Sequence, residues 1–173
     1  ARVRRGTLIA LDQMDDGRLS RDMVAPLLDT VDADLQQAAL RVISGRPGWS
    51  DEIRSLLARL LKRPSISDGE RAMVRGALLA FCEDKQIQQL VASTLLEDRA
   101  ARDVRALLLE VIGRGGVSPL PASWIQATAH SLQSADAAVL RQAVATASGV
   151  GSAAHHATTL RKLAHDVQQP RAL

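Results

Sequence analysis

The chain has 173 residues, of which 46% are apolar, 24% charged and 2% aromatic, and its formal net charge is +3. A chain of this length can bury about 70% of the surface that it exposes when unfolded, so a disordered protein is not expected. No apolar run approaches the roughly 18 residues that cross a bilayer, so membrane insertion is not expected either. Alanine and leucine predominate and tyrosine is absent, which is typical of helices rather than strands.

Five segments of the chain share one apolar pattern. Their first residues, at spacings of 32, 38, 31 and 36 residues, are Val3, Leu35, Met73, Val104 and Leu140. In residues 35–43 the apolar side chains recur at i, i+3, i+4, i+7 and i+8, which is the stripe of an amphipathic helix. A period near 34 residues is typical of a helical-repeat protein.

A second amphipathic stretch follows each of these segments. These stretches cover residues 23–28, 53–61, 87–96, 124–132 and 160–167, and the last can begin as early as His155. Because a two-helix hairpin cannot bury its own stripe, neighbouring hairpins must cover one another. The sequence therefore predicts an all-α fold, an α-solenoid or HEAT-like array of about five antiparallel helical hairpins. The unequal spacings leave a closed helical bundle as the alternative.

The predicted repeats cover residues 1–31, 32–68, 69–99, 100–135 and 136–173 of a single domain. Polar residues mark several helix starts: a capping box at Ser67 and Glu70, N-caps at Asp32 and Asp136, and Ser50 or Asp51 before the stretch 53–61. Glycine and proline mark the ends of the first helices, at 15–17, 45–48, 113–121 and 149–151. Small residues within the stripes are expected to let neighbouring helices approach closely: Gly6, Ala38, Ala39, Gly76, Ala77, Ala106 and Ala143.

The first-helix segments 35–43 and 104–113 resemble HEAT and armadillo repeats. More particularly, residues 5–14, 23–29 and 40–49 resemble the helical-repeat segment of large membrane-bound dehydrogenases of planctomycetes and verrucomicrobia. Those proteins place a sugar-dehydrogenase-like β-propeller before the helices and a cytochrome c module after them, and are exported. The resemblance, and a first residue that is not methionine, imply a segment of a longer periplasmic protein that spaces two redox modules.

No residue pattern indicates catalysis, a cofactor or a metal site. The only cysteine, Cys82, lies in an apolar stretch and is interpreted as a core residue, and there is no Cys-x-x-Cys-His haem signature. The four histidines lack the spacing of a metal site and are interpreted as solvated or helix-end residues. The glycine-rich stretch 114–119 follows a helix and lacks the lysine of a phosphate-binding loop, so it is interpreted as a turn. The acidic pairs at 15–16 and 97–98 are interpreted as caps or solvated residues.

The expected function is a non-catalytic scaffold that contacts a protein partner, or neighbouring domains, through its second helices. The residues predicted on that surface are Trp49, Arg54, Arg59, Lys62, Trp124 and Arg161. Core packing is the competing interpretation for both tryptophans. A nucleic-acid-binding module is the alternative, although residues 86–96 and 124–132 carry no Lys or Arg and would interrupt a basic stripe. Apolar stripes left uncovered at the terminal hairpins predict end-to-end self-association.

Overall fold

A computed structural model describes residues 2–14, 19–30, 32–46, 48–97, 99–149 and 153–168. Within these ranges the chain forms ten α-helices and one 3₁₀-helix, and it contains no strand. The predicted all-α class is therefore confirmed. No helix in the described part of the chain has both the length and the apolar character needed to span a membrane.

The helices belong to two compact units, and the chain passes from the first unit to the second between Ile87 and Gln88. The elements are α1 (Arg2–Asp12), α2 (Arg21–Val24), the 3₁₀-helix η1 (Ala25–Asp29), α3 (Ala33–Ser44), α4 (Ser50–Leu61), α5 (Asp68–Ala80), α6 (Lys85–Leu96), α7 (Arg102–Arg114), α8 (Ala122–Ser131), α9 (Ala137–Ala147) and α10 (Ala153–Gln168). Every predicted stretch overlaps a helix to within one residue at its end, and the boundary between the units lies inside α6.

One predicted stretch has an unexpected form. Residues 23–28 were expected to make one amphipathic helix, but α2 ends at Val24 and continues as the tighter helix η1. Pro26 accounts for the change because it has no N–H to donate to the preceding turn. Val24 and Leu28 are nevertheless buried, so the stretch still contributes its apolar side to the core.

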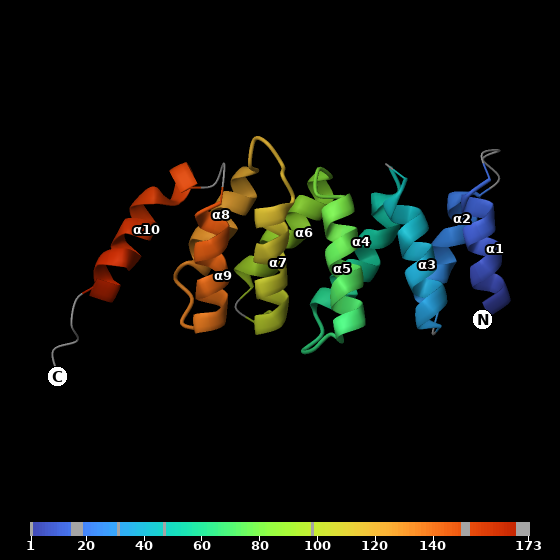
Figure 1. Ribbon diagram of the computed structural model, residues 1–173, viewed down its shortest axis with the longest axis horizontal. Coiled ribbons are helices and arrows are strands. Elements are labelled where there is room, and N and C mark those ends of the chain that lie inside the picture. The colour runs from blue at the N-terminus through green and yellow to red at the C-terminus, as the bar shows by residue number, and fades with distance from the viewer. Residues whose placement is uncertain are drawn as a thin grey trace. The chain divides into compact units, whose positions relative to one another are not determined.

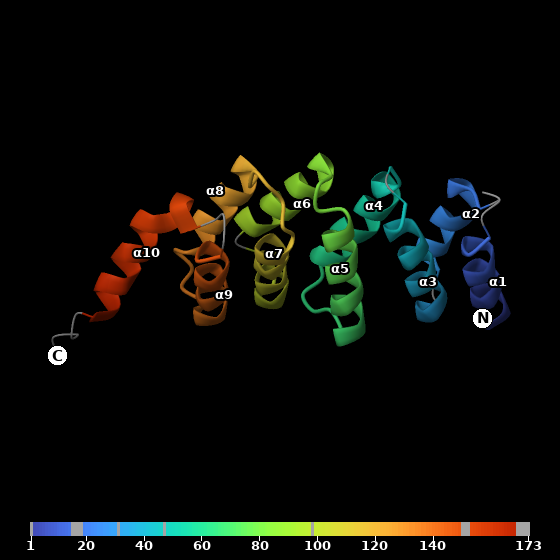
Figure 2. The ribbon, with the colours of Figure 1, turned by 45° about the horizontal axis from the view of Figure 1, so that its top comes forward.

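In the first unit, α3 is the central element (Figure 1). It packs against α1 on one side and α5 on the other, and it also contacts η1 and α4. Figure 2 shows α1, α3 and α5 in one layer and α2 with α4 in a second layer. Every apolar residue of the predicted stripe of α3 is buried: Leu35, Ala38, Ala39, Val42 and Ile43. Arg46, just after α3, forms an ion pair of 2.7 Å with Asp12 at the end of α1.

In the second unit, α9 contacts α7, α8 and α10, and its most extensive contact is with α7 (Figure 1). The Oγ1 atom of Thr146 in α9 donates a hydrogen bond of 2.8 Å to the carbonyl oxygen of Leu109 in α7. Trp124 in α8 is 0% exposed, and its indole Nε1 donates a bond of 3.0 Å to the carbonyl oxygen of Gln88. Thus the largest side chain of the unit closes its core, as the packing interpretation of the sequence expected.

Three of the predicted helix starts are confirmed. Ser67 and Glu70 form the full capping box of α5. The side chains of Asp32 and Asp136 accept hydrogen bonds from the first backbone N–H groups of α3 and α9. These bonds are local in sequence, which is why the residue pattern alone could locate them.

The predicted cap of α4 is wrong. Trp49 occupies the N-cap position and makes no side-chain cap bond, while Ser50 is already helical. The Ser50 hydroxyl instead donates a bond of 2.7 Å to Asp84 Oδ2. The other oxygen of Asp84 accepts from the N–H groups of Gln86 and Ile87 at the start of α6. Ser50 therefore joins the beginnings of two helices that are far apart in sequence.

The small residues of the stripes act only in part as expected. Ala38, Ala39, Ala77 and Ala143 are buried. Gly6 and Gly76 are exposed, and nothing lies within 4 Å of where a Cβ atom would be, so the expected close approach is absent there. Among the predicted helix ends, Gly48 and Gly116 have positive φ angles of 93° and 64°, whereas the stretches at 15–17 and 150–151 lie outside the described residues.

Candidate interaction groove

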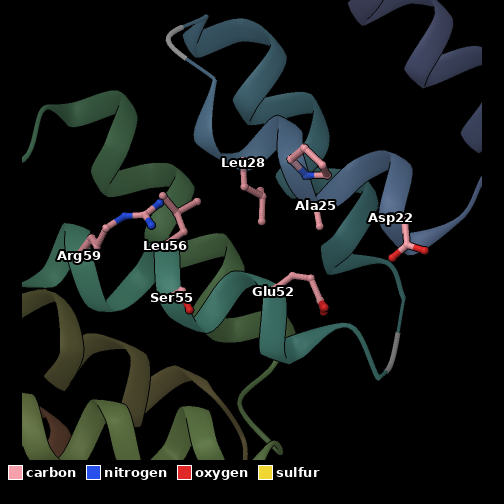
Figure 3. A pocket seen from close by; sticks show the side chains of 8 residues that line it. Asp22, Ala25, Leu28, Glu52, Ser55, Leu56 and Arg59 are labelled. Carbon is pink, nitrogen blue, oxygen red and sulfur yellow. The ribbon is translucent and has the colours of Figure 1, made fainter.

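A groove lies between α2–η1 and α4 in the first unit (Figure 3). Its volume is about 380 Å³. One wall comes from Asp22, Ala25, Pro26 and Leu28, and the other comes from Glu52, Ser55, Leu56 and Arg59. Both walls belong to second helices of consecutive hairpins, which is the part of the protein where the sequence predicted an interaction surface.

The α4 wall follows from the periodicity of the helix. Its four lining residues stand at positions i, i+3, i+4 and i+7, so they share one helical face. This face adjoins the core stripe of α4, because Leu56 belongs to both and is buried. The helix therefore uses one side for the core and the adjacent side for the groove.

The opposite wall is shaped by η1. The carbonyl oxygen of Leu28 accepts a hydrogen bond of 2.6 Å from Gln36 Nε2, which holds the end of η1 against α3. Ala25 and Pro26 present small apolar surfaces next to it. Together with Leu56 these residues give the middle of the groove a mainly apolar surface, beside which lies the hydroxyl of Ser55.

The two ends of the groove carry opposite charges. Figure 3 shows Asp22 and Glu52 toward one end and Arg59 at the other. Glu52 Oε1 forms an ion pair with Nε of Arg21. The Glu52 side chain is only 12% exposed, and its second oxygen, Oε2, is buried without a hydrogen-bond partner in the described part of the structure. Asp22 and Glu52 carry two negative charges and Arg21 carries one positive charge, so this end of the groove has a net negative charge.

Helix chemistry explains part of this polarity. Acidic residues in the first turn and basic residues in the last turn of an α-helix interact favourably with its dipole, and Glu52 and Arg59 of α4 occupy those turns. The dipole does not explain why both residues lie on the groove side. That placement depends on their seven-residue separation, which is two helical turns.

The predicted interaction residues separate into different places. Arg59 lines the groove. Arg54 is exposed on a different side of α4, and Lys62 is exposed just after the end of α4; neither lines the groove. Arg161 is exposed on α10 in the second unit. Of the basic residues that the sequence predicted, Arg59 therefore lines the groove of the first unit, and the other three do not.

The two tryptophans also differ. Trp49 is half-buried, and the guanidinium carbon of Arg46 lies 5.1 Å from its ring centroid. Trp124 is completely buried, so its prediction as part of an interaction surface is wrong. Its ring fills the core of the second unit and its only polar atom is used by Gln88.

The residues considered for catalysis lie in packed or isolated positions. Cys82 is buried, and burial, followed by the charge of Glu83, raises the pKa of its thiol. His156 is 2% exposed and therefore not solvated, although it lies in the first turn of α10, at a helix end. Among the described residues, no group of three or more His, Cys, Asp or Glu side chains could hold a metal ion.

The glycine-rich stretch 114–119 is the turn between α7 and α8, as expected. Arg114 forms an ion pair of 2.7 Å with Glu110 of the same helix. Residues of the turn line a hollow of about 720 Å³ together with Thr146 and His155. The described lining contains no arrangement of backbone donors and lysine typical of a phosphate site.

Comparison of the chain with family models, with curated proteins and with solved structures finds no match. A function must therefore be argued from the geometry of the chain itself. The groove is the place where that geometry combines shape, apolar surface and charge.

Sequence reasoning found Arg59 but missed Asp22, Glu52 and Ser55. The spacing of residues 52, 55, 56 and 59 could have shown a second face on α4, because it repeats the helical rule beside the core stripe. The facing wall could not have been found this way. It depends on how η1 packs against α3 and α4, which no local pattern contains.

Proposed function

We propose that this chain is a non-catalytic helical-repeat scaffold that binds protein partners along its second helices. The observation that carries the proposal is the groove between η1 and α4, which has an apolar middle and oppositely charged ends. Such a surface offers shape and charge complementarity to a polypeptide. It lacks the convergent polar groups that an enzyme needs around a reacting atom.

The array itself is part of this proposal. The hairpins within each unit pack against one another through buried apolar stripes, and we propose that they continue as an open, HEAT-like α-solenoid. In such an array, two consecutive second helices form the two walls of one groove. The groove of the first unit is then one site in a series of related sites.

A non-catalytic role is supported by the positions of the reactive side chains. Cys82 is buried and its pKa is raised by burial, so a nucleophilic thiolate is disfavoured. His156 is buried as well and faces no described hydrogen-bond partner for its Nε2 atom. Both residues fit better as parts of the packing than as parts of an active site.

The resemblance to the helical segment of exported dehydrogenases leads to a second part of the proposal. In that setting the scaffold would space a propeller from a cytochrome c module, and its grooves would hold segments of those modules or of an associated protein. Sequencing the complete reading frame tests this directly. A propeller before the helices and a Cys-x-x-Cys-His motif after them are expected, and a reading frame without either contradicts this parentage.

Photo-crosslinking tests the scaffold function. Benzoylphenylalanine is placed at Ser55, which lines the groove, and in a second protein at Arg54, which is exposed on another side of the same helix. In an extract of the cells that produce the protein, we expect a discrete protein adduct from Ser55 and less from Arg54. If neither position yields an adduct above the level of a free surface probe, the proposed interaction function is wrong.

A further inference from the structure

A second groove of the first unit lies in the layer of first helices, between α3 and α5 (Figure 2). Its volume is about 260 Å³, and it shares no lining residue with the groove between α2–η1 and α4. The buried side chains of Leu40 and Ala77 lie at its base. It therefore belongs to a face of the protein to which the scaffold proposal assigns no partner.

The two walls of this groove differ in chemistry. The α3 wall consists of polar side chains that can donate hydrogen bonds: Gln37, Arg41 and Ser44. These residues stand at positions i, i+4 and i+7, so they share one face of the helix. The α5 wall consists of side chains without a donor: Ala72, Met73 and Gly76. A complementary ligand therefore has hydrogen-bond acceptors on one side and apolar groups on the other.

Arg41 gives the groove an unpaired positive charge. Its side chain is exposed and forms no ion pair or hydrogen bond with another described residue. A hollow on the α1 side of α3 is also lined by Arg41, but the acidic residues of that hollow have other partners. Asp34 lies 4.0 Å from Arg5, and Asp12 lies 2.7 Å from Arg46.

The helix dipole explains only part of the position of Arg41. A cation in the last turn of α3 interacts favourably with the dipole of that helix. This interaction does not use the hydrogen-bond donors of the guanidinium group, which point into water or toward a ligand. A carboxylate suits them best, because its two oxygens can accept two parallel hydrogen bonds from one arginine.

Gly76 keeps the apolar wall open. It lies inside α5, where glycine is less favourable than alanine. Nothing lies within 4 Å of where its Cβ atom would be, so packing within the unit does not require a glycine there. A side chain at this position would extend into the space of the groove, and its absence leaves room for an apolar side chain of a ligand.

A protein ligand fits this groove better than a nucleic acid does. A protein that follows a phosphate backbone needs several basic residues. Arg41 is the one charged side chain among the described residues that line the groove, and the opposite wall is apolar. An acidic polypeptide segment with an apolar side satisfies both walls.

We propose that the groove between α3 and α5 binds a segment of a partner protein that has acidic side chains on one side and apolar side chains on the other. Arg41 pairs with a carboxylate of this segment, and an apolar side chain of the segment lies over Gly76. The site is additional to the groove that Ser55 lines, so the crosslinks expected at Ser55 do not depend on it.

Two fluorescein-labelled peptides serve as probes. Glu-Leu-Ala-Ala-Glu-Leu-Leu-Ala-Glu-Leu-Ala-Ala has adjacent acidic and apolar sides as a helix, and Ser-Glu-Leu-Glu-Leu-Glu-Leu-Ser has acidic and apolar sides as an extended chain. In two comparison peptides lysine replaces every glutamate. At low ionic strength, we expect at least one acidic probe to bind at least about threefold more tightly than its lysine counterpart in fluorescence anisotropy. The probe that binds identifies the conformation of the ligand.

A charge change at Arg41 tests the polar wall. In Arg41→Glu we expect the acidic probe to bind at least about fivefold more weakly, and its lysine counterpart to bind more tightly than it binds the wild type. The gain of binding shows that the variant is folded. Arg54→Glu makes the same charge change at an exposed position of α4 and is expected to leave both affinities unchanged.

A side chain at position 76 tests the apolar wall. Gly76→Gln places a side chain in the groove, and we expect the acidic probe to bind at least about threefold more weakly. Because glutamine favours a helix and the space is open, the urea midpoint is expected to stay the same or rise. Gly6→Gln is the matched control, since Gly6 is also an exposed helical glycine with nothing within 4 Å of a Cβ atom. It is expected to leave the affinity unchanged.

Four results overturn the inference. Neither acidic probe binds, or each binds no more tightly than its lysine counterpart. The control variants Arg54→Glu and Gly6→Gln lose as much affinity as the groove variants. A duplex DNA oligonucleotide binds more tightly than both acidic probes and loses affinity in Arg41→Glu, which would assign the face to nucleic acid.

Discussion

Helices α1 and α7 have the same apolar pattern in the sequence, but they differ in burial. In α7 the stripe is buried throughout, from Val104 to Ile112. In α1 only Leu8 is buried among the described residues, while Val3 is 81% exposed and Ile9 is also exposed. The difference shows that an apolar stripe predicts a helix, whereas the burial of that stripe depends on the neighbouring helices that it contacts.

Two threonines show the same difference between α1 and the second unit in their hydrogen bonds. Thr146 in α9 reaches the carbonyl oxygen of Leu109 in α7, and the bond is buried. Thr7 in α1 donates to Val3 of its own helix, and the bond is exposed. Thr146 therefore joins two helices of the second unit, whereas Thr7 joins residues of α1 alone.

The largest effect is expected from Trp124→Ala. This substitution removes a fully buried ring and leaves the Gln88 carbonyl without its indole donor, so we expect a loss of about 3–5 kcal/mol in the free energy of unfolding. Trp49→Ala is the matched variant in the first unit. It removes a half-buried ring that contacts Arg46, and we expect a loss below about 1.5 kcal/mol. Urea unfolding followed by circular dichroism measures both, and equal losses would show that burial does not separate the two residues.

A pH-dependent loss of stability is expected from His156. Burial, followed by the charge of His155, lowers the pKa of His156 below its usual value of 6.5. The folded protein therefore keeps this histidine neutral where the unfolded chain already binds a proton, so stability is full above about pH 6.5 and falls as the pH decreases below it.

The urea midpoint measures this effect. We expect a lower midpoint at about pH 5 than at about pH 7.5, and a smaller decrease in His156→Leu. Thr158→Val changes an exposed, uncharged residue of the same helix and is expected to behave as the wild type. An unchanged pH dependence in His156→Leu would assign the decrease to other groups.

Thr146→Val sharpens the comparison of the two threonines. The variant keeps the shape of the side chain but loses the bond to Leu109, so we expect a loss of about 1 kcal/mol in the free energy of unfolding. Thr7→Val removes the exposed bond in α1 and is expected to change stability by less than about 0.5 kcal/mol. A larger effect at Thr7 than at Thr146 would reverse the assignment of the stabilising contacts.

The smallest effect is expected from the exposed apolar residues of the first hairpin. Val3 and Met14 are exposed, which predicts weak self-association that rises with concentration. In sedimentation velocity we expect Val3→Glu with Met14→Glu to weaken it at least about fivefold. Thr7→Glu with Gln13→Glu adds the same charge at exposed polar positions of the same segment and serves as the control. A wild-type protein that is monomeric at every concentration contradicts the prediction.

Much of the fold could be predicted from the sequence because it depends on short-range chemistry. The apolar stripe of α3, the capping box at Ser67 and the N-caps at Asp32 and Asp136 all involve residues within one or two turns. The hydrogen bond from Ser50 to Asp84 could not be predicted in this way. It joins residues that only the packing of α4 and α6 brings together.

The groove shows the same division. Arg59 was predicted because it is a basic residue on a second helix, and Arg54 and Lys62 met the same criterion yet lie outside the groove. Asp22 was missed because its partner wall is about thirty residues away in sequence. Likewise, adjacent histidines differ, since His156 turns toward the core and His155 toward solvent.

Small-angle X-ray scattering tests most directly whether the hairpins form an open array that presents successive grooves. A closed globule of this length has a radius of gyration of about 16 Å. For the monomer at low concentration we predict a radius above about 20 Å and a distance distribution with a long tail. A radius near 16 Å with a single symmetric distribution would contradict the open scaffold.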